Sequence, residues 1–233
     1  MRPFSPHRLR PLLAILYDIH GNVDALDAVL ADVRAAGANR YLLGGDYGLP
    51  SPAPLETLER LQALPNATWI RGNGERWLRE PPTDRPEIAD EYERHTRQLP
   101  EDVIEWLYNL PPQTEADGIL YVHGSPLSDV DSFAPQPQEG EDRMLVGVRD
   151  RTVVFGHSHQ QFRRPGPDGT YLVNPGSVGM PLDGDPRAAW ALWDGDFEFR
   201  RTEYDVERAA AAYRGMGGDF AEWAANRILR GAD

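Results

Sequence analysis

The stretch Leu12–Asn22, which reads LLAILYDIHGN, joins an apolar run of strand length to an abrupt polar turn. The next residues, Val23–Ala36, carry apolar side chains at helical spacing and are followed by a glycine. Segments with strand, helix and strand character come next: Arg40–Gly44, Leu55–Leu64 and Thr68–Arg71. This βαβαβ order predicts an α/β fold. It also places the polar residues after each strand at the carboxyl end of a sheet, where such folds build their sites.

The middle of the chain interrupts this alternation. Residues 76–111 are charged and favour helices, which we expect at Glu87–Leu99 and Asp102–Leu110, each near a proline. Strand patterns then dominate: Ile119–Val122, Thr152–Phe155, Gln161–Arg163, Tyr171–Val173, Ala189–Trp193 and Phe197–Glu203. We expect a single domain over residues 1–233 with a helical insertion at about 76–111. Two amphipathic stretches near the C-terminus predict helices that pack on a sheet: Val206–Arg214 and Phe220–Leu229.

The composition excludes several kinds of chemistry. The chain has no cysteine, and all 24 of its basic residues are arginine, so disulfides, thiolate nucleophiles and lysine Schiff bases are ruled out. A net charge of −13 without an arginine-rich stripe argues against a long nucleic-acid partner. No apolar run approaches the roughly 20 residues of a membrane span. The first residues lack a signal-peptide pattern, so we expect no membrane partner and a cytoplasmic location.

Two acidic motifs follow the first strands. Asp18 and His20 stand two residues apart, and in extended backbone they would point to one side, roughly 7 Å apart, within reach of one ion. Asp46 follows Gly44-Gly45, and its carboxylate has the two oxygens needed to bridge two ions. The alternative is structural: a capping aspartate with a satisfied histidine, and an ordinary Asx turn.

The segment Arg71–Glu75 leaves the next strand. Asn73 offers a neutral carbonyl oxygen to an ion, and Arg71 could present its planar guanidinium to a phosphate oxygen. By itself this segment could be a simple turn. A glycine-bounded loop, Asn174–Pro181, follows a later strand, and its glycines could let the backbone approach the site, with a tight turn as the alternative.

Histidines end two further strands. His123 follows one of them, and His157 and His159 follow the other as a His-x-His pair. Two imidazoles on one face are costly to leave unpaired in a core, so this pair is the strongest single indication of a metal site. His7 and His95 have no such context, and we expect both at the surface.

The order of these motifs, D-x-H-G-N, G-D, R-G-N, H-G, G-H-x-H and N-P-G-S-V-G-x-P, resembles the calcineurin-like metallophosphoesterase superfamily, in particular its small prokaryotic phosphodiesterase-type branch. The resemblance covers about Leu12–Trp193. It implies a four-layer α/β/β/α sandwich of two mixed sheets flanked by helices. It also implies two divalent ions, the first held by Asp18, His20, Asp46 and His159, and the second by Asp46, Asn73, His123 and His157.

The resemblance further implies a hydrolase. A water or hydroxide that bridges two ions about 4 Å apart would attack a small phosphate ester in line, and Asp46, Asn73 and Arg71 would contribute to catalysis. Imidazole, carboxylate and amide ligands suit Mn, Fe, Zn, Ni or Co. Because metal-binding imidazoles must be neutral, we expect activity to fall below about pH 6.5.

One position departs from the family pattern. Many relatives have Gly-Asn-His where this chain has Gly72-Asn73-Gly74, so the usual acid for the leaving group is missing. We therefore expect a preference for phosphodiesters or other esters with good leaving groups. The alternatives are a non-catalytic protein-binding scaffold, and a nuclease or nucleotide phosphatase of the same superfamily. The sequence does not reveal the oligomeric state. An exposed apolar patch could form an interface between subunits, and the tryptophans include candidates for such a patch: Trp69, Trp77, Trp106, Trp190, Trp193 and Trp223.

Overall fold

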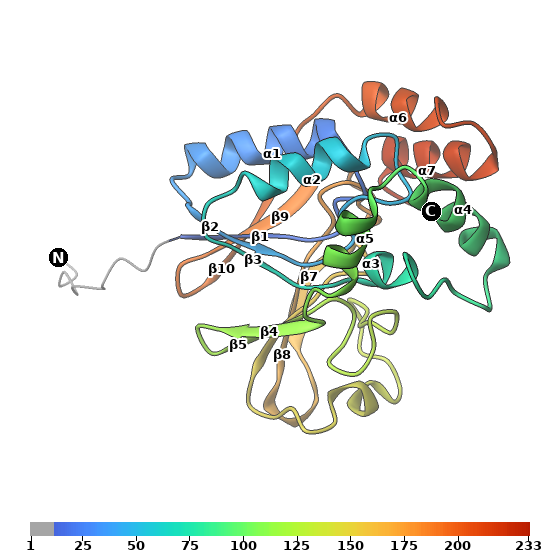
Figure 1. Cartoon of the computed structure of the whole chain (residues 1–233). Coiled ribbons are helices and arrows are strands. Elements are labelled where there is room, and N and C mark those ends of the chain that lie inside the picture. Colours follow the sequence, from blue (N-terminus) through green and yellow to red (C-terminus); the bar gives the residue numbers. More distant parts are fainter. Residues whose placement is uncertain (1–11) are drawn as a thin grey trace.

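The computed structural model describes residues 12–233, and its strands form two five-stranded sheets that pack face to face (Figure 1). The prediction for His7 lies outside the described residues. The first sheet has the order β10-β9-β1-β2-β3. The strands β1, β2 and β3 are parallel, and β9 is antiparallel to both of its neighbours, β1 and β10. Its strands are β1 (Leu13–Leu16), β2 (Arg40–Leu43), β3 (Ala67–Trp69), β9 (Ala188–Trp193) and β10 (Phe197–Thr202).

The second sheet has the order β4-β5-β6-β8-β7. Its three central strands are parallel, and an antiparallel strand pairs at each edge, so both sheets are mixed. Its strands are β4 (Gln113–Ala116), β5 (Ile119–Val122), β6 (Thr152–Val154), β7 (Gln161–Pro165) and β8 (Tyr171–Pro175).

The strand β1 explains why the first apolar run has no polar alternation. Leu13 and Ile15 pack between the two sheets, whereas Ala14 and Leu16 pack beneath the helices. All four residues are buried, because successive side chains of a strand point to opposite faces and both faces of this strand are covered.

The α-helices cover the outer face of the first sheet and one end of this sandwich. Figure 1 shows α1 and α2 above the first sheet, with α3, α4, α5, α6 and α7 gathered at one end. The outer face of the second sheet is covered by a segment that includes a short 3-10 helix, η1 (Glu141–Leu145). The helices are α1 (Val23–Ala35), α2 (Pro54–Gln62), α3 (Asn73–Trp77), α4 (Pro86–Thr96), α5 (Glu101–Tyr108), α6 (Val206–Arg214) and α7 (Asp219–Arg230).

The predicted sandwich of two mixed sheets flanked by helices is confirmed. The sequence patterns missed β4, a short and largely polar edge strand, and α3, whose first residues read as a turn. The prediction that the last two helices pack on a sheet was wrong. Their buried side chains form a cluster with each other and with Met180, and α6 also contacts α1.

The prediction of a surface position for His95 was also wrong. The residue is 4% exposed, because it lies one turn after the buried Tyr92 on the inner face of α4. Its ring is satisfied locally, by Gln98 at 2.9 Å and the Glu91 carboxylate at 3.3 Å. None of the helices among the described residues combines the length and the apolar character that crossing a bilayer requires.

Candidate metal centre

The polar residues that end four strands meet in one place. Asp18 and His20 follow β1, Asp46 follows β2, His123 follows β5, and the His157/His159 pair follows β6. Two groups of side chains result, each with its ligand atoms within 4.8 Å of one another: Asp18, His20 and His159 in one, and Asp46, His123 and His157 in the other. The carboxyl ends of strands from both sheets therefore build one candidate centre.

The loops that carry these side chains have left-handed backbone. The φ angles of the five residues lie between 50° and 63°: Asp18, His20, Asp46, His157 and His159. The expectation of extended backbone at Asp18 and His20 was therefore wrong. Left-handed conformations at non-glycine residues cost on the order of 1 kcal/mol or more each and cluster at functional sites.

Backbone contacts hold these strained loops in position. The amides of Ile19 and His20 both donate to the carbonyl of Asp46, each at 2.9 Å. The glycine-bounded loop after β8 closes on the same turn, where the amide of Gly179 and the hydroxyl of Ser177 donate to the carbonyl of Asp18 at 3.0 and 2.7 Å. A Cβ at Gly179 would collide with the carbonyl of Ile19, so only glycine permits this approach.

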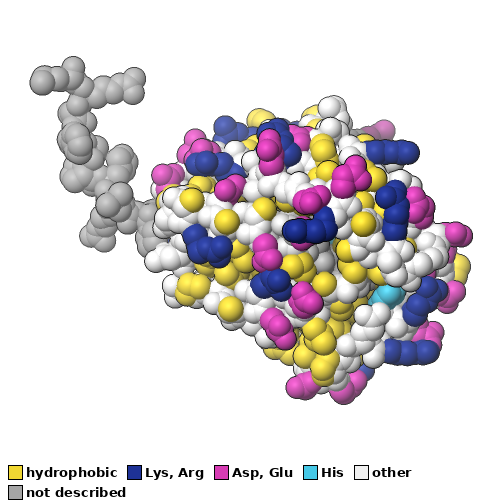
Figure 2. Space-filling view, turned by 90° about the horizontal axis from the view of Figure 1, so that it is seen from above, with side chains coloured by type: hydrophobic (Ala, Val, Ile, Leu, Met, Phe, Trp, Pro, Cys, Tyr) yellow, Lys and Arg dark blue, Asp and Glu magenta, His cyan; other side chains and the backbone are white. Residues whose placement is uncertain are grey.

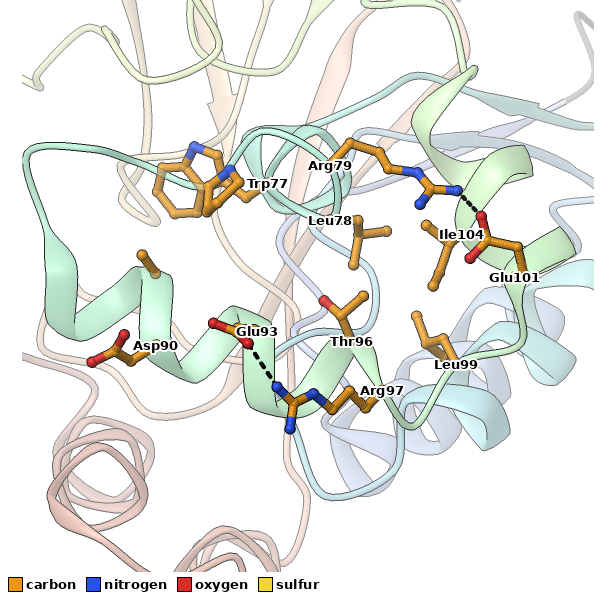
Figure 3. A pocket seen from close by; sticks show the side chains of 12 residues that line it. Trp77, Leu78, Arg79, Asp90, Glu93, Thr96, Arg97, Leu99, Glu101 and Ile104 are labelled. Carbon is orange, nitrogen blue, oxygen red and sulfur yellow. Dashed lines mark hydrogen bonds and ion pairs between the residues drawn. The ribbon is translucent and has the colours of Figure 1, made fainter.

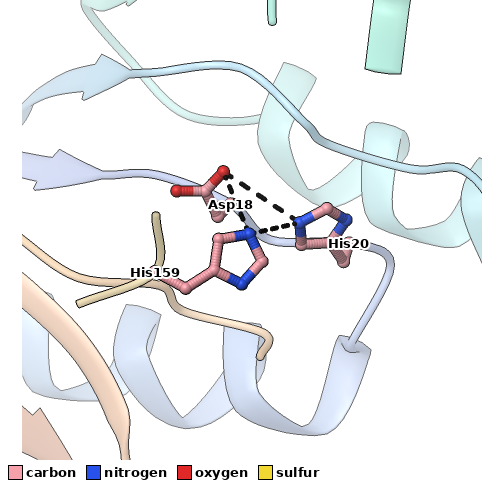
Figure 4. A group of neighbouring side chains, drawn as sticks. All are labelled: Asp18, His20 and His159. Carbon is pink, nitrogen blue, oxygen red and sulfur yellow. Dashed lines mark hydrogen bonds and ion pairs between the residues drawn. The ribbon is translucent and has the colours of Figure 1, made fainter. Parts of the chain in front are cut away.

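The first group surrounds one oxygen of Asp18 (Figure 4). Oδ1 of Asp18 lies 3.5 Å from Nε2 of His159 and 4.0 Å from Nε2 of His20, and the two imidazole nitrogens lie 3.0 Å apart. Oδ2 of Asp18 accepts a hydrogen bond from the amide of His157 at 3.0 Å, which fixes the orientation of the carboxylate.

Asp46 stands between the two groups. Its Oδ2 lies 3.9 Å from Nε2 of His20 in the first group, and its Oδ1 lies 3.5 Å from Nε2 of His123 in the second. The amide of Gly74 donates to Oδ1 at 2.7 Å and orients the carboxylate. One oxygen toward each group is the arrangement that a bridging carboxylate requires.

Hydrogen bonds to the outer ring nitrogens set the tautomers of two histidines. Nδ1 of His123 lies 2.8 Å from the carbonyl of Gly44, and Nδ1 of His159 lies 2.6 Å from the carbonyl of Met180. A carbonyl only accepts, so Nδ1 carries the proton in each ring. The neutral form of each ring then directs the lone pair of Nε2 toward the carboxylates, as a metal ligand must.

The donor set fits cations. Oδ1 of Asp18 is buried and has no hydrogen-bond partner among residues 12–233. The side chain of Asn73 lies beside the imidazoles of the second group, within 3.0 Å of Nε2 of His123 and 2.8 Å of Nδ1 of His157. A buried carboxylate oxygen without a donor is costly unless a positive charge lies beside it.

Burial and neighbouring charges lower the pKa of some of these imidazoles and raise the pKa of another. Burial and the repulsion of neighbouring imidazoles lower the pKa of His20 and of His157 to about 4. Burial also disfavours the charged form of His123, but the carboxylates, Asp46 above all, outweigh it and raise the pKa of His123 to about 10. Burial opposes the charge of Asp46 as well, yet the imidazoles, led by His123, hold its pKa well below the usual range.

We expect metal binding to release protons. At about pH 8, His123 with a pKa of about 10 is charged before an ion binds and must be neutral to coordinate it, whereas His20 and His157 with a pKa of about 4 are already neutral. Binding of Mn²⁺ should therefore release at least one proton, and the apparent affinity should rise with pH toward 10. Titration calorimetry in two buffers of different ionisation enthalpy measures the release, and equal heats in both buffers would contradict the prediction.

Glu75 is a positioning residue that the sequence patterns did not single out. Its buried carboxylate accepts hydrogen bonds from three amides, those of Asp46 at 2.9 Å, Tyr47 at 2.8 Å and Gly72 at 2.9 Å. Burial and the charge of Asp46 raise the pKa of Glu75 to about 7, against these three donors. The signal in the sequence was an acidic residue three positions after Gly72, which is the spacing of a capping box.

Substituting Glu75→Gln should loosen this arrangement. The amide group of glutamine would turn two donor hydrogens toward backbone N–H groups, so at least one buried donor would lose its acceptor. We expect the melting temperature to fall and the affinity for Mn²⁺ to drop about tenfold, the lower end of what outer-shell changes cost. Calorimetry measures both. Glu59→Gln, on the exposed face of α2, is the control, and no difference between the two variants would contradict the role.

The structure does not bring Arg71 into the centre. Its guanidinium donates to the carbonyl of Tyr108 at 2.7 Å and lies 5.2 Å from the centroid of the Tyr108 ring. It lines a separate cavity behind His123, beside the Arg76–Asp129 ion pair. We therefore leave Arg71 out of the site proposed below.

The centre opens into a cavity of about 330 Å³. Among the described residues that line it, every imidazole and carboxylate belongs to one of the two groups. The remaining lining is largely apolar and aromatic, with two arginines: Pro50, Asn73, Trp77, Arg85, Ile88, Tyr92, Ser158, Met180, Leu182, Phe220, Trp223 and Arg227.

A second cavity, of about 550 Å³, lies between α3, α4 and α5 (Figure 3). Trp77 lines both cavities, but none of the candidate ligands lines this one. Charged side chains at its edge pair with one another, Arg97 with Glu93 at 2.6 Å and Arg79 with Glu101. The chemistry of the candidate centre therefore belongs to the smaller cavity.

Comparison with known proteins agrees with this fold. The protein MJ0912 of Methanocaldococcus jannaschii is 25% identical over 252 residues, which cover 96% of this chain and 99% of that protein. The crystal structure of a metallophosphoesterase from Sphaerobacter thermophilus is 25% identical with a TM-score of 0.76, and the match covers 95% of this chain and 100% of that one. The protein PH1004 of Pyrococcus horikoshii has the same fold, with a TM-score of 0.79 at 21% identity over 96% of this chain and 100% of that one.

The two mixed sheets and the histidine–aspartate groups at their carboxyl ends define an α/β protein with a candidate metal centre. Residues 12–195 match the family model of the calcineurin-like phosphoesterase superfamily domain. The chain belongs to this superfamily, as its motifs predicted. Membership and the two candidate ligand groups together support metal-dependent hydrolysis of phosphate esters.

Proposed function

We propose that this protein is a dinuclear metal-dependent phosphoesterase that acts on small phosphodiesters or on phosphate esters with good leaving groups. The observation that carries the proposal is the position of Asp46, with one carboxylate oxygen toward each of the two candidate ligand groups, at the base of a cavity. Two divalent ions at these groups supply charge neutralisation for the phosphate and activate water as the nucleophile.

Each ion is proposed to have four ligands from the chain, with Asp46 shared between the two. Asp18, His20, Asp46 and His159 are proposed to hold the first ion, and Asp46, Asn73, His123 and His157 the second. The lowered pKa of His20 and of His157 keeps two of these imidazoles neutral. Neutral imidazole and amide ligands leave the centre positive, which favours a phosphate even in a protein of net charge −13.

The lining of the cavity supports the preference for good leaving groups. Position 74 carries no side chain, and a Cβ there would lie 2.8 Å from Oδ1 of Asp46 and 3.0 Å from the hydroxyl of Tyr92. Asp46 and Tyr92 therefore crowd the position at which many relatives carry a histidine. The Tyr92 hydroxyl donates to the carbonyl of Leu49, and burial raises its pKa well above 10.

Elemental analysis of purified protein, combined with hydrolysis of bis(p-nitrophenyl) phosphate, tests the proposal. We expect about two divalent ions per chain, loss of hydrolysis with a chelator, and recovery with at least one of Mn, Fe, Zn, Ni or Co. A protein that binds metal but hydrolyses no ester with any of these ions would be a scaffold. Preferential hydrolysis of polynucleotides would identify a nuclease.

A further inference from the structure

The walls of the cavity come from helices that carry none of the candidate ligands. The base is formed by the strand-end loops, whereas one wall is the α4 segment with Ile88 and Tyr92, and the facing wall is α7 with Phe220, Trp223 and Arg227. The proposed chemistry does not use either wall. Their side chains therefore determine which organic groups fit beside the phosphate.

Trp223 is the most exposed aromatic side chain of this lining. It is 43% exposed on α7, although a tryptophan side chain gains more than most from burial. The ring of Phe220 lies beside it, with centroids 5.4 Å apart and planes tilted by 42°. The guanidinium carbon of Arg227 lies 3.9 Å from the centroid of the Trp223 ring. The mouth of the cavity thus has a planar apolar surface that is already ordered.

Arg227 has an unused donor beside this surface. Its guanidinium pairs with Asp233 through Nη2, but its buried Nε has no hydrogen-bond acceptor among residues 12–233. Burial lowers the pKa of Arg227 to about 10. Because this nitrogen is sealed from the cavity, Arg227 contributes its positive charge and its stacking on Trp223 to the mouth of the cavity.

The cavity continues outward between the same two helices. An adjoining hollow of about 770 Å³ shares Arg85, Ile88, Phe220, Trp223 and Arg227 with it. Arg85 is exposed and forms no ion pair with a described residue. The cavity of about 330 Å³ at the centre lies at the small end of the roughly 300–1,000 Å³ of small-molecule sites. The cavity and the adjoining hollow together therefore have room for a flat group of more than one ring.

We propose that α7 is the recognition helix for the organic group of the ester, and that this group carries an aromatic ring system. The ring packs at Trp223 and Phe220, beside the positive charge of Arg227. This inference rests on the proposed function, because the candidate metal ligands place the phosphate and so bring its substituent to α7. Aryl esters and nucleotides share this chemistry, and the test separates them.

Phosphonates test the inference without turnover, because their C–P bond is not hydrolysed by phosphoesterase chemistry. The full chain, loaded with the metal that restores hydrolysis, is titrated by calorimetry with methylphosphonate, phenylphosphonate and the methylene phosphonate analogue of AMP. We expect a ring to raise the affinity over methylphosphonate about tenfold, as single ring contacts do. Tighter binding of the phenyl compound identifies aryl esters, and tighter binding of the AMP analogue identifies nucleotides.

Variants assign the effect to Trp223. Trp223→Ala should remove the advantage of the ring and leave methylphosphonate binding unchanged, and Trp223→Phe should retain most of the advantage. Tyr171→Ala, an exposed aromatic residue of β8 outside the cavity, is the control and should change neither. If methylphosphonate binds but the ring gives no advantage, or Trp223→Ala keeps it, the inference is wrong and the proposed function stands. If no phosphonate binds the metal-loaded chain, the inference is also wrong, whereas the proposed function fails only if none of the metals restores hydrolysis.

Discussion

Replacing Asp46 with asparagine is expected to lower kcat/KM for bis(p-nitrophenyl) phosphate by a factor on the order of 10³ or more, comparable to the loss of a principal electrostatic group in other active sites. The carboxylate faces His20 with one oxygen and His123 with the other. An amide keeps the shape but removes the negative charge from between two cations and leaves only one oxygen to bind them. Steady-state kinetics with elemental analysis of the same preparation measures both effects.

The control for this substitution is Asp194→Asn, which removes a carboxylate after β9, far along the chain from the candidate ligands and outside their cavity. It should retain full activity and metal content. Circular dichroism establishes that the Asp46→Asn protein is folded. A folded Asp46→Asn protein that keeps two ions and hydrolyses the diester within tenfold of the parent would remove the basis of the proposed function.

A series of esters should show a steep dependence on the leaving group, with p-nitrophenyl diesters cleaved about 10²–10⁴-fold faster than alkyl monoesters. The physical reason is that, among residues 12–233, no imidazole or carboxylic acid outside the candidate ligand groups lines the cavity. A departing alkoxide would leave without a proton from a side chain. The rate plotted against the pKa of the leaving group measures the dependence.

Tyr92→Phe is the matched variant for this series. The Tyr92 hydroxyl lies next to Gly74, together with the Asp46 carboxylate, and burial raises the pKa of Tyr92 well above 10, which makes it a poor acid. We expect the same slope in the variant. Alkyl monoesters cleaved as fast as activated aryl diesters would show that the protein has a source of protons, and a steeper slope in Tyr92→Phe would identify it as this phenol.

The positions of the candidate ligands along the chain could be predicted from the sequence. Leu13–Leu16 is apolar at every position because both of its faces are buried, so its end before Asp18 is unmistakable. The carboxyl ends of parallel strands meet at one edge, so the same pattern before Asp46 and Asn73 predicted that these motifs would lie with Asp18. His123 follows a strand of the second sheet, and only the family resemblance placed it with them. The structure brings them together, while their role as ligands stays a prediction.

Other features depended on contacts that no local pattern carries. The left-handed backbone at Asp18 is fixed by hydrogen bonds from residues 177 and 179, far along the chain. Glu75 matters because its carboxylate reaches amides of two segments. The burial of His95 reflects the packing of α4 against the core, where Glu91 is buried beside it, whereas the charged sequence of this helix indicated a solvent-exposed position.

The carbonyl of Asp46 accepts hydrogen bonds from two amides of the turn after β1. The main chain that follows β2 is thereby joined to the main chain that follows β1. These backbone hydrogen bonds hold the two turns together, so the polypeptide would set the dimensions of the proposed metal centre. Exchanging one transition metal for another should then change the speed of the reaction while the loops keep their shape. Ions whose radii do not match this rigid frame would be excluded by it.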